Sequence, residues 1–173
     1  MRHWENLLLS QKESQKESAT QQIRHAEHND VQAIADLLPE LAAFDVPKGR
    51  NSKDLWEGDL ATLYRWRDDL EPQVMVHVAE ATSGTIEGFT IVRLREELMS
   101  HEPSSHLEAI VVAETARGTG LGRRLLENAE QQARSAGAKT ITLHVFGNNE
   151  RARSVYRKLG YDEELIRDIK YLE

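Results

Sequence analysis

The stretch Leu107-Glu108-Ala109-Ile110-Val111-Val112 is followed, after four residues, by Arg117-Gly118-Thr119-Gly120-Leu121-Gly122-Arg123-Arg124. The first run is apolar and β-branched, which is typical of a buried strand. Residues 121–136 place leucine and alanine at helical spacing, which predicts an amphipathic helix. The first turn of a helix has free N–H groups and a partial positive charge. The sequence therefore predicts a site for the phosphate of a phosphorylated ligand at this turn.

The composition excludes several function classes. The chain has 173 residues, a net charge of −7 and a pI of about 5.5, which disfavours wholesale binding to nucleic acid. It has no cysteine, so disulfides, thiolate nucleophiles and cysteine metal sites are excluded. The histidines lack metal-ligand spacing, and we expect no metal. No apolar window is long enough for a membrane helix, and no signal peptide is evident, so we expect a cytoplasmic protein.

Two regions differ in composition. Residues 1–20 are polar and contain the repeat Gln-Lys-Glu-Ser at 11–14 and 15–18. We expect a flexible tail there, with a solvated helix or docking through Trp4 and three leucines as alternatives. Residues 21–173 are expected to form one domain.

Periodicity and turn residues predict the order of elements in that domain. The expected elements are a strand at 23–26, a helix after Asn29 or Asp30 that Pro39 kinks or shortens, one or two helices in 52–70, and a hairpin of strands 74–79 and 86–94. They continue with a strand at 106–112, a helix at 121–136, a strand at 140–146, a helix capped by Asn148 or Asn149, and a closing antiparallel strand in 161–172. A helix joins strands 106–112 and 140–146, so these should be parallel. The fold class is therefore α/β, a mixed sheet with helices on its faces.

The glycine run departs from two well-known phosphate motifs. It lacks the Gly-Lys-Ser/Thr ending of a P-loop. It also lacks the GxGxxG spacing of a dinucleotide fold, and Gly-Asn-Asn rather than a carboxylate follows the next strand. The sequence therefore disfavours both a P-loop NTPase and a dinucleotide-binding fold.

The run does match Arg117-x-x-Gly120-x-Gly122, and a second motif follows it, formed by Asn149, Ala152, Tyr156, Gly160 and Tyr161. With both motifs in order, residues 22–172 resemble the GCN5-related N-acetyltransferase (GNAT) family. The sequence departs from the family at Glu114-Thr115-Ala116, where proline and an aromatic residue often stand. The resemblance implies a mixed, mostly antiparallel sheet with helices on both faces and a splayed central parallel strand pair.

The resemblance also implies acetyl-CoA as the donor, bound through the backbone of the turn and of the strand before it. The implied cofactor-binding residues are Ile110, Val111, Val112, Arg117, Gly118, Thr119, Gly120, Leu121, Gly122, Arg123, Asn149 and Tyr156. Asn149 can also act as a helix cap, and Arg124 can be a solvated helix residue.

For the chemistry, the resemblance implies direct acetyl transfer to a primary amine in a ternary complex. Tyr156 stands at the family's general-acid position, and its alternative is a core tyrosine. Glu108 is the candidate general base, because a carboxylate in an apolar strand has a raised proton affinity; it can instead be structural or orient the substrate. His106 is a second candidate base, whereas His144 is expected to be packed.

The acceptor is less well defined. The resemblance places acceptor specificity in residues 41–66 and 165–170, and Phe44 and Asp45 are candidate substrate-binding residues together with Glu108. The negative net charge favours a cationic amine, either a small molecule or a peptide. From the resemblance to the family we also expect a homodimer. The alternative function is a non-catalytic acyl-CoA-binding or regulatory module with the same fold.

Overall fold

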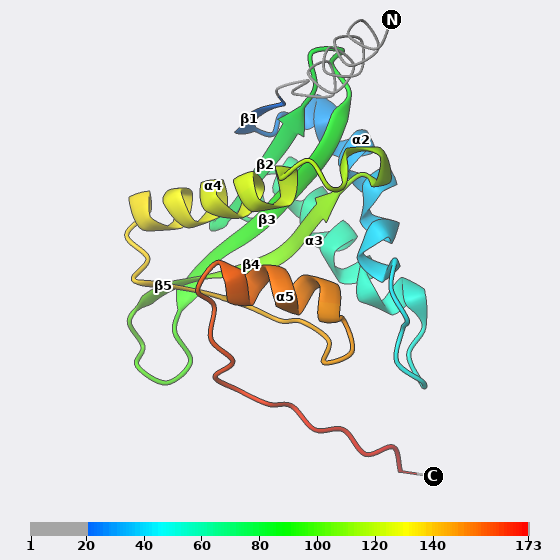
Figure 1. Ribbon diagram of the computed structural model, residues 1–173. Helices are drawn as coiled ribbons and strands as arrows, with labels where there is room; N and C mark the ends of the chain where they lie inside the picture. Colours follow the sequence, from blue (N-terminus) through cyan, green and yellow to red (C-terminus); the bar gives the residue numbers. More distant parts are fainter. Residues whose placement is uncertain (1–20, 173) are drawn as a thin grey trace, which may run out of the picture.

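The computed structural model describes residues 21–172, so the tail expected at residues 1–20 lies outside the described residues, as does Glu173. The described residues form one sheet with strand order β1-β2-β3-β4-β5 (Figure 1). All neighbouring strands are antiparallel except β4 and β5, which are parallel, as the sequence predicted. The strands are β1 Gln22–His25, β2 Val74–Glu80, β3 Ile86–Glu96, β4 Pro103–Val112 and β5 Thr140–Leu143.

Helices cover both faces of this sheet. They are α2 Val31–Leu37, α3 Glu57–Arg67, α4 Leu121–Ser135 and α5 Glu150–Lys158. Because side chains alternate along a strand, Val76 and Val78 pack with α2 and α3, whereas Met75 and Ala79 belong to clusters on the α4 side. Figure 1 shows α4 and α5 together over that second face. The predicted α/β fold class is confirmed.

Proline and glycine end the helices where the sequence predicted. Helix α2 stops at Leu37, and a 3-10 helix containing Pro39 follows, because proline cannot donate the next helical hydrogen bond. Gly137 and Gly160 follow α4 and α5 with φ of +90° and +87°, the left-handed conformation that glycine adopts without strain.

A bulge interrupts β4 at Glu108. Opposite it on β3, Ile91 pairs with Ala109 but the next residue, Val92, pairs with Leu107. Glu108 is therefore an extra residue without a cross-strand partner, as in a β-bulge. Its side chain joins that of Arg93 on the face covered by α2 and α3, while Leu107 packs toward α4.

The parallel pair separates soon after it forms. Strands β4 and β5 pair from Ser104 with Thr140 to Leu107 with Leu143, and β5 then ends. Strand β4 continues for five residues, Glu108–Val112, with no strand along its β5 side among residues 21–172. This separation leaves strand backbone available to an extended ligand between β4 and the chain that follows β5.

The closing strand expected in residues 161–172 is wrong. The segment is irregular and runs away from α5 toward the C-terminus (Figure 1). Its apolar residues Leu165, Ile166, Ile169 and Leu172 are exposed. Strand β5 offers only four residues as a template, too few to order a charged segment by pairing alone. In the described residues β5 is therefore an edge strand, and the parallel pair lies at one side of the sheet.

Candidate functional site

The turn between β4 and α4 leaves a row of backbone donors unused. Gly118 and Gly120 have φ of +80° and +82°, a conformation that favours glycine, and both are exposed. The first helical bond runs from Arg124 N to Gly120 O at 3.2 Å. No hydrogen bond within residues 21–172 uses the N–H groups of residues 118–123. With the helix dipole behind them, these groups form a site for an anion.

Open space surrounds these donors. A Cβ built on Gly118 or Gly120 would meet no atom within 4 Å, whereas one on Gly122 would lie 3.5 Å from Val112 Cγ2. The start of α4 therefore packs beside the end of β4, and the donors face outward. The side chain of Leu121 is buried in the core, so only its backbone is available to a ligand.

The arginines of the turn differ in their partners. The Arg117 guanidinium forms an ion pair with Glu40, and its Nε donates to Val112 O at 3.2 Å. Arg123 is exposed and pairs with Glu127 at 2.7 Å. Arg124 donates to Gln21 at the start of the sheet, which gives it a structural role. The charge offered to an anion here comes from the backbone and from partly neutralised side chains.

The end of β4 adds the expected strand contacts. Val111 is buried in the core under α2 and α3, and Ile110 and Val112 are half-buried toward α4. Their side chains are thus used in packing. The backbone on the β5 side is what they can offer to a ligand.

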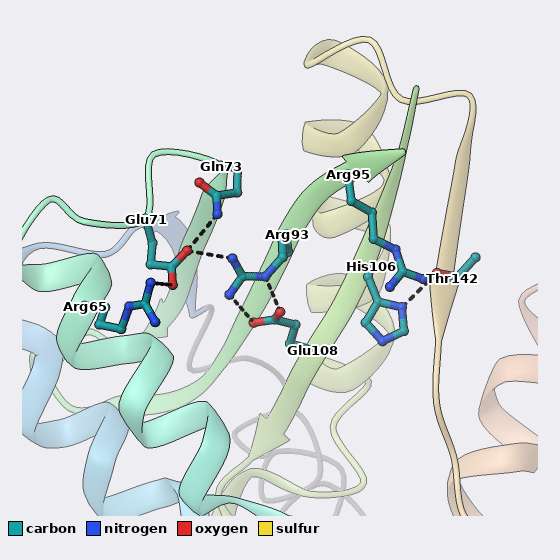
Figure 2. A network of polar contacts seen from close by, with 8 residues as sticks. All are labelled: Arg65, Glu71, Gln73, Arg93, Arg95, His106, Glu108 and Thr142. Carbon is teal, nitrogen blue, oxygen red and sulfur yellow. Dashed lines mark hydrogen bonds and ion pairs between the residues drawn. The ribbon is translucent and has the colours of Figure 1, made fainter. Parts of the chain in front are cut away.

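Glu108 belongs to an ion-pair network (Figure 2). Arg93 Nε donates to Glu108 Oε1 at 2.5 Å, and Arg93 Nη1 donates to Glu71 Oε2 at 2.6 Å. Arg65 and Gln73 also bind Glu71, at 3.0 and 2.7 Å. Arg93, directly between two carboxylates, holds the pKa of Glu71 below its ordinary value. Glu108 therefore has a permanent cationic partner.

His106 lies beside this network on β4. Its Nδ1 is 2.8 Å from Thr142 Oγ1 on β5 (Figure 2). Its ring also lies against that of His144, with the centroids 4.6 Å apart and the ring planes tilted by 59°. Burial lowers the pKa of His106 to about 4, with smaller contributions from Arg95 and His144. Such an imidazole is a weak base, which leaves His106 a packing residue between the parallel strands.

Tyr156 and Asn149 lie on α5, over the opposite face of the sheet from Glu108. Tyr156 packs against the cluster of Val92, Leu107 and Leu126, and burial raises the pKa of its phenol. Its hydroxyl has no hydrogen-bond partner among residues 21–172. Asn149 Oδ1 accepts from Ala152 N at 3.1 Å, so the capping role is present, and its amide nitrogen is left for another partner.

The loop that carries Phe44 and Asp45 reaches the end of β5. The rings of Phe44 and Phe146 lie 5.5 Å apart, and Asn148 Nδ2 donates to Asp45 O at 2.5 Å. These contacts place both residues next to the point where β4 and β5 separate. Asp45 offers its backbone rather than its carboxylate to Asn148.

The C-terminal end lies over the same loop. A Cβ on Gly49 would lie 2.9 Å from Tyr171 Cζ. Gly49, in the expected acceptor region 41–66, thus contacts Tyr171, which directly follows the expected region 165–170, although more than a hundred residues separate the two.

Asp59 on α3 is a candidate site residue that the sequence interpretation did not name. It is half-buried, and its pKa is raised to about 7, chiefly by burial and then by the charge of Glu108. The available signal was its spacing: Asp59 stands on the helix stripe of Trp56, Leu60 and Leu63, which packs into the core. A carboxylate on an apolar stripe is costly unless it has a role.

Residues 21–172 contain neither a metal-binding cluster nor a membrane-spanning helix. No group of three or more histidine, aspartate or glutamate side chains is arranged to hold a metal ion there. No helix in the same range has the length and hydropathy to cross a bilayer.

Comparisons with known proteins agree with this geometry. The model of the Acetyltransferase (GNAT) family matches residues 35–161. The chain is 33% identical over 142 residues to the uncharacterized N-acetyltransferase YhfO of Bacillus subtilis, which covers 82% of this chain and 90% of that protein.

Solved structures of low sequence identity share the fold. A Trypanosoma brucei acetyltransferase, 21% identical, superposes with a TM-score of 0.64 and covers 88% of this chain and 99% of its own. Glucosamine-6-phosphate N-acetyltransferase from Arabidopsis thaliana, 22% identical, does so with a TM-score of 0.61 over 89% of this chain and 99% of its own.

Proposed function

Because the chain belongs to the acetyltransferase (GNAT) family, we propose that it moves the acetyl group of acetyl-CoA to a primary amine by direct transfer in a ternary complex. The observation that carries the proposal is the row of unused N–H groups at residues 118–123, next to the unpaired side of β4. A pyrophosphate needs the first feature, and a chain of amides needs the second.

The residues present fit acetyl-CoA. The backbone of Gly118 to Arg123 would hold the pyrophosphate, with Arg117 close by. The backbone of Ile110, Val111 and Val112 and the free amide nitrogen of Asn149 would hold the pantetheine arm. When bound, acetyl-CoA supplies the activated acetyl group.

Tyr156 would give a proton or a strong hydrogen bond to the departing thiolate. Its raised pKa keeps the phenol protonated at neutral pH, as a donor must be. Between the roles open to Glu108, its ion pair with Arg93 favours that of an orienting carboxylate over that of a base. A carboxylate held by a guanidinium is fixed in direction, as an orienting group must be.

For the acceptor we propose a cationic amine on a small molecule or a peptide. Phe44 and Asp45 would line its entrance, because their loop meets the end of β5. The acidic side chains Glu71, Glu108 and Asp59 on this side of the sheet, together with the net charge of −7, support a positively charged partner.

We also propose that the protein acts in the cytoplasm and forms a homodimer. The exposed apolar residues of the segment after α5 support self-association, because such residues are costly to leave in water.

An acceptor screen tests the proposed activity. Purified protein, acetyl-CoA and a panel of polyamines, amino acids, amino sugars and peptides with free N-termini are incubated, and mass spectrometry detects the gain of one acetyl group. We expect at least one amine to be acetylated with stoichiometric release of CoA. Tight acetyl-CoA binding with no product from any amine would instead support the non-catalytic module.

A further inference from the structure

Asp59 occupies an unusual position in the first turn of α3. The same helix stripe carries Trp56, Leu60 and Leu63, which pack into the core between α2, α3 and the sheet. The first turn of a helix stabilises a negative charge, and solvent does the same, so an ordinary carboxylate there would be fully ionised. Asp59 is instead only partly exposed, and Glu108 of β4 is near enough to act on its charge.

The charges around Asp59 are arranged asymmetrically. Glu108 on β4 is the charged group that acts on it, and Glu108 is itself bound to Arg93 of β3, which also binds Glu71. Within residues 21–172 neither carboxylate oxygen of Asp59 has a hydrogen bond or an ion pair. Other carboxylates on the two helices of this face have partners of their own: Glu57 of α3 pairs with Lys53 at 3.1 Å, and Asp36 of α2 accepts from Gln32 at 2.8 Å.

The site thus contains two carboxylates of different character. Glu108 has a fixed cation, whereas Asp59 has none and lies under burial and like charge. Two carboxylates in such different surroundings are a usual basis for dividing roles within a site.

Building on the proposed function, we propose that Asp59, rather than Glu108, binds the ammonium group of the acceptor and removes its proton. The N–H bond of the ammonium breaks and its proton passes to Asp59 Oδ. The freed nitrogen lone pair then forms the bond to the acetyl carbon, the C–S bond breaks, and the sulfur keeps that electron pair and takes a proton from Tyr156. The nitrogen of the new amide loses its second proton through water to the Tyr156 phenolate, so Tyr156 is restored and Asp59 keeps the one proton released overall.

The position of Asp59 also indicates a class of acceptor. One carboxylate without a counter-ion, beside a second one held by Arg93, offers a net negative charge to a compact cation. The ammonium of an alkylamine supplies that charge and the proton that must be lost, since its ordinary pKa is about 10.4. An aromatic amine, which is neutral at pH 7, would gain nothing from this arrangement.

The test compares Asp59→Asn with Glu57→Gln, which removes an exposed carboxylate two residues earlier in the same helix. With the alkylamine of highest turnover in the acceptor screen, CoA release is measured from pH 5.5 to 9. We expect kcat/KM of Asp59→Asn to fall about 100-fold or more at neutral pH. The rise of wild-type activity through pH about 7 should disappear in this variant and persist in Glu57→Gln.

A stability measurement separates this role from a structural one. Because the pKa of Asp59 is raised in the folded state, the folded protein becomes less stable as the pH rises from the ordinary aspartate pKa to about 7. Asp59→Asn should therefore have an equal or higher Tm than wild type at pH 8, whereas a structural Asp59 would make the variant less stable. If the wild type acetylates an amine and Asp59→Asn shows the same pH profile, the assignment of Asp59 is wrong but the proposed function stands. Absence of turnover in the wild type on every amine overturns the proposed function.

Discussion

Tyr156 gains its proposed role from its surroundings. Because burial raises the pKa of this phenol and its hydroxyl is unpaired in the described part of the chain, Tyr156→Phe removes one oxygen without disturbing the packing of the ring. We expect kcat to fall about 10- to 100-fold, KM for acetyl-CoA to change little and Tm to stay within about 2 °C. Steady-state CoA release and a thermal melt measure these quantities. An unchanged kcat would show that Tyr156 is only a core residue.

Arg93 is the residue on which the acidic side of the site depends. Arg93→Met keeps the apolar stem but leaves Glu108 and the buried Glu71 without this cation, and removing one partner of such a pair is costly. We expect Tm to fall by about 5–10 °C at pH 7, with a smaller loss below pH about 4, because Arg93 holds the pKa of Glu71 below its ordinary value and that contribution is lost once Glu71 is protonated. Arg95→Met, which removes an exposed bond to Thr142, is the control and should shift Tm by less than half as much. Equal shifts in both variants would contradict the argument.

Helix α4 tests the phosphate site, because its two ends offer matched glycines. Gly120 and Gly137 have φ of +82° and +90°, and a Cβ on either would meet no atom within 4 Å. Substitution by glutamate therefore adds similar backbone strain, about 1 kcal/mol, at each end. Only Gly120→Glu also puts a negative charge beside the unused N–H groups.

We expect Gly120→Glu to weaken acetyl-CoA binding at least 10-fold in calorimetry, and Gly137→Glu to leave it within about twofold. Both variants should lose a similar few degrees of Tm. If Gly120→Glu bound acetyl-CoA as wild type does, the assignment of the turn to the pyrophosphate would be wrong.

At the scale of elements, prediction succeeded where the signal was local. The glycine turn, the proline after α2, the Asn149 cap and the β2–β3 hairpin each depend on residues within a few positions of one another. The strand expected in residues 161–172 does not form, because apolar residues in a segment do not by themselves make it pair with a neighbour. Whether a strand forms depends on the template, and β5 ends at Leu143.

The stability of the whole molecule should depend on two buried histidines. Burial lowers the pKa of His77 and of His106 to about 4, from an ordinary value near 6.5. Between pH about 4 and pH about 6.5 the unfolded chain binds protons that the folded protein does not. The contribution of these histidines to the free energy of unfolding is therefore greatest above pH about 6.5 and falls as the pH drops toward 4. Neither ring nitrogen of His77 has a partner within residues 21–172, so its charged form would be unpaired.

Urea unfolding at pH 7 and pH 4.5 measures this effect. We expect His77→Gln to be less stable than wild type at pH 7 but to lose less stability on acidification. The exposed His101→Gln should follow the wild type at both pH values. A wild-type midpoint that did not change between the two pH values would contradict the assignment.

The proposed homodimer gives a prediction at the same scale. Ile166 is 87% exposed in the segment after α5, so Ile166→Asp should not disturb the fold of the chain itself. We expect this variant to sediment as a monomer at a concentration where the wild type is a dimer, with an unchanged Tm extrapolated to low concentration. Equal sedimentation of the two proteins as dimers would place the interface elsewhere.

The sequence by itself determined the order of the elements, the α/β class, the anion-binding turn and the family. Each of these is encoded by short-range features: periodicity, glycine and proline positions, and motif spacing. No short-range feature of the sequence predicts the long-range side-chain pairs. Examples are Arg117 with Glu40, 77 residues apart, and Arg93 with Glu108 across a bulge. Only the tertiary structure decided that Glu108 has a fixed cation, and that Asp59, on which the charge of Glu108 acts, has none within residues 21–172. The proton affinity of a carboxylate is set by its burial and by the charges around it, and both depend on how distant segments pack together.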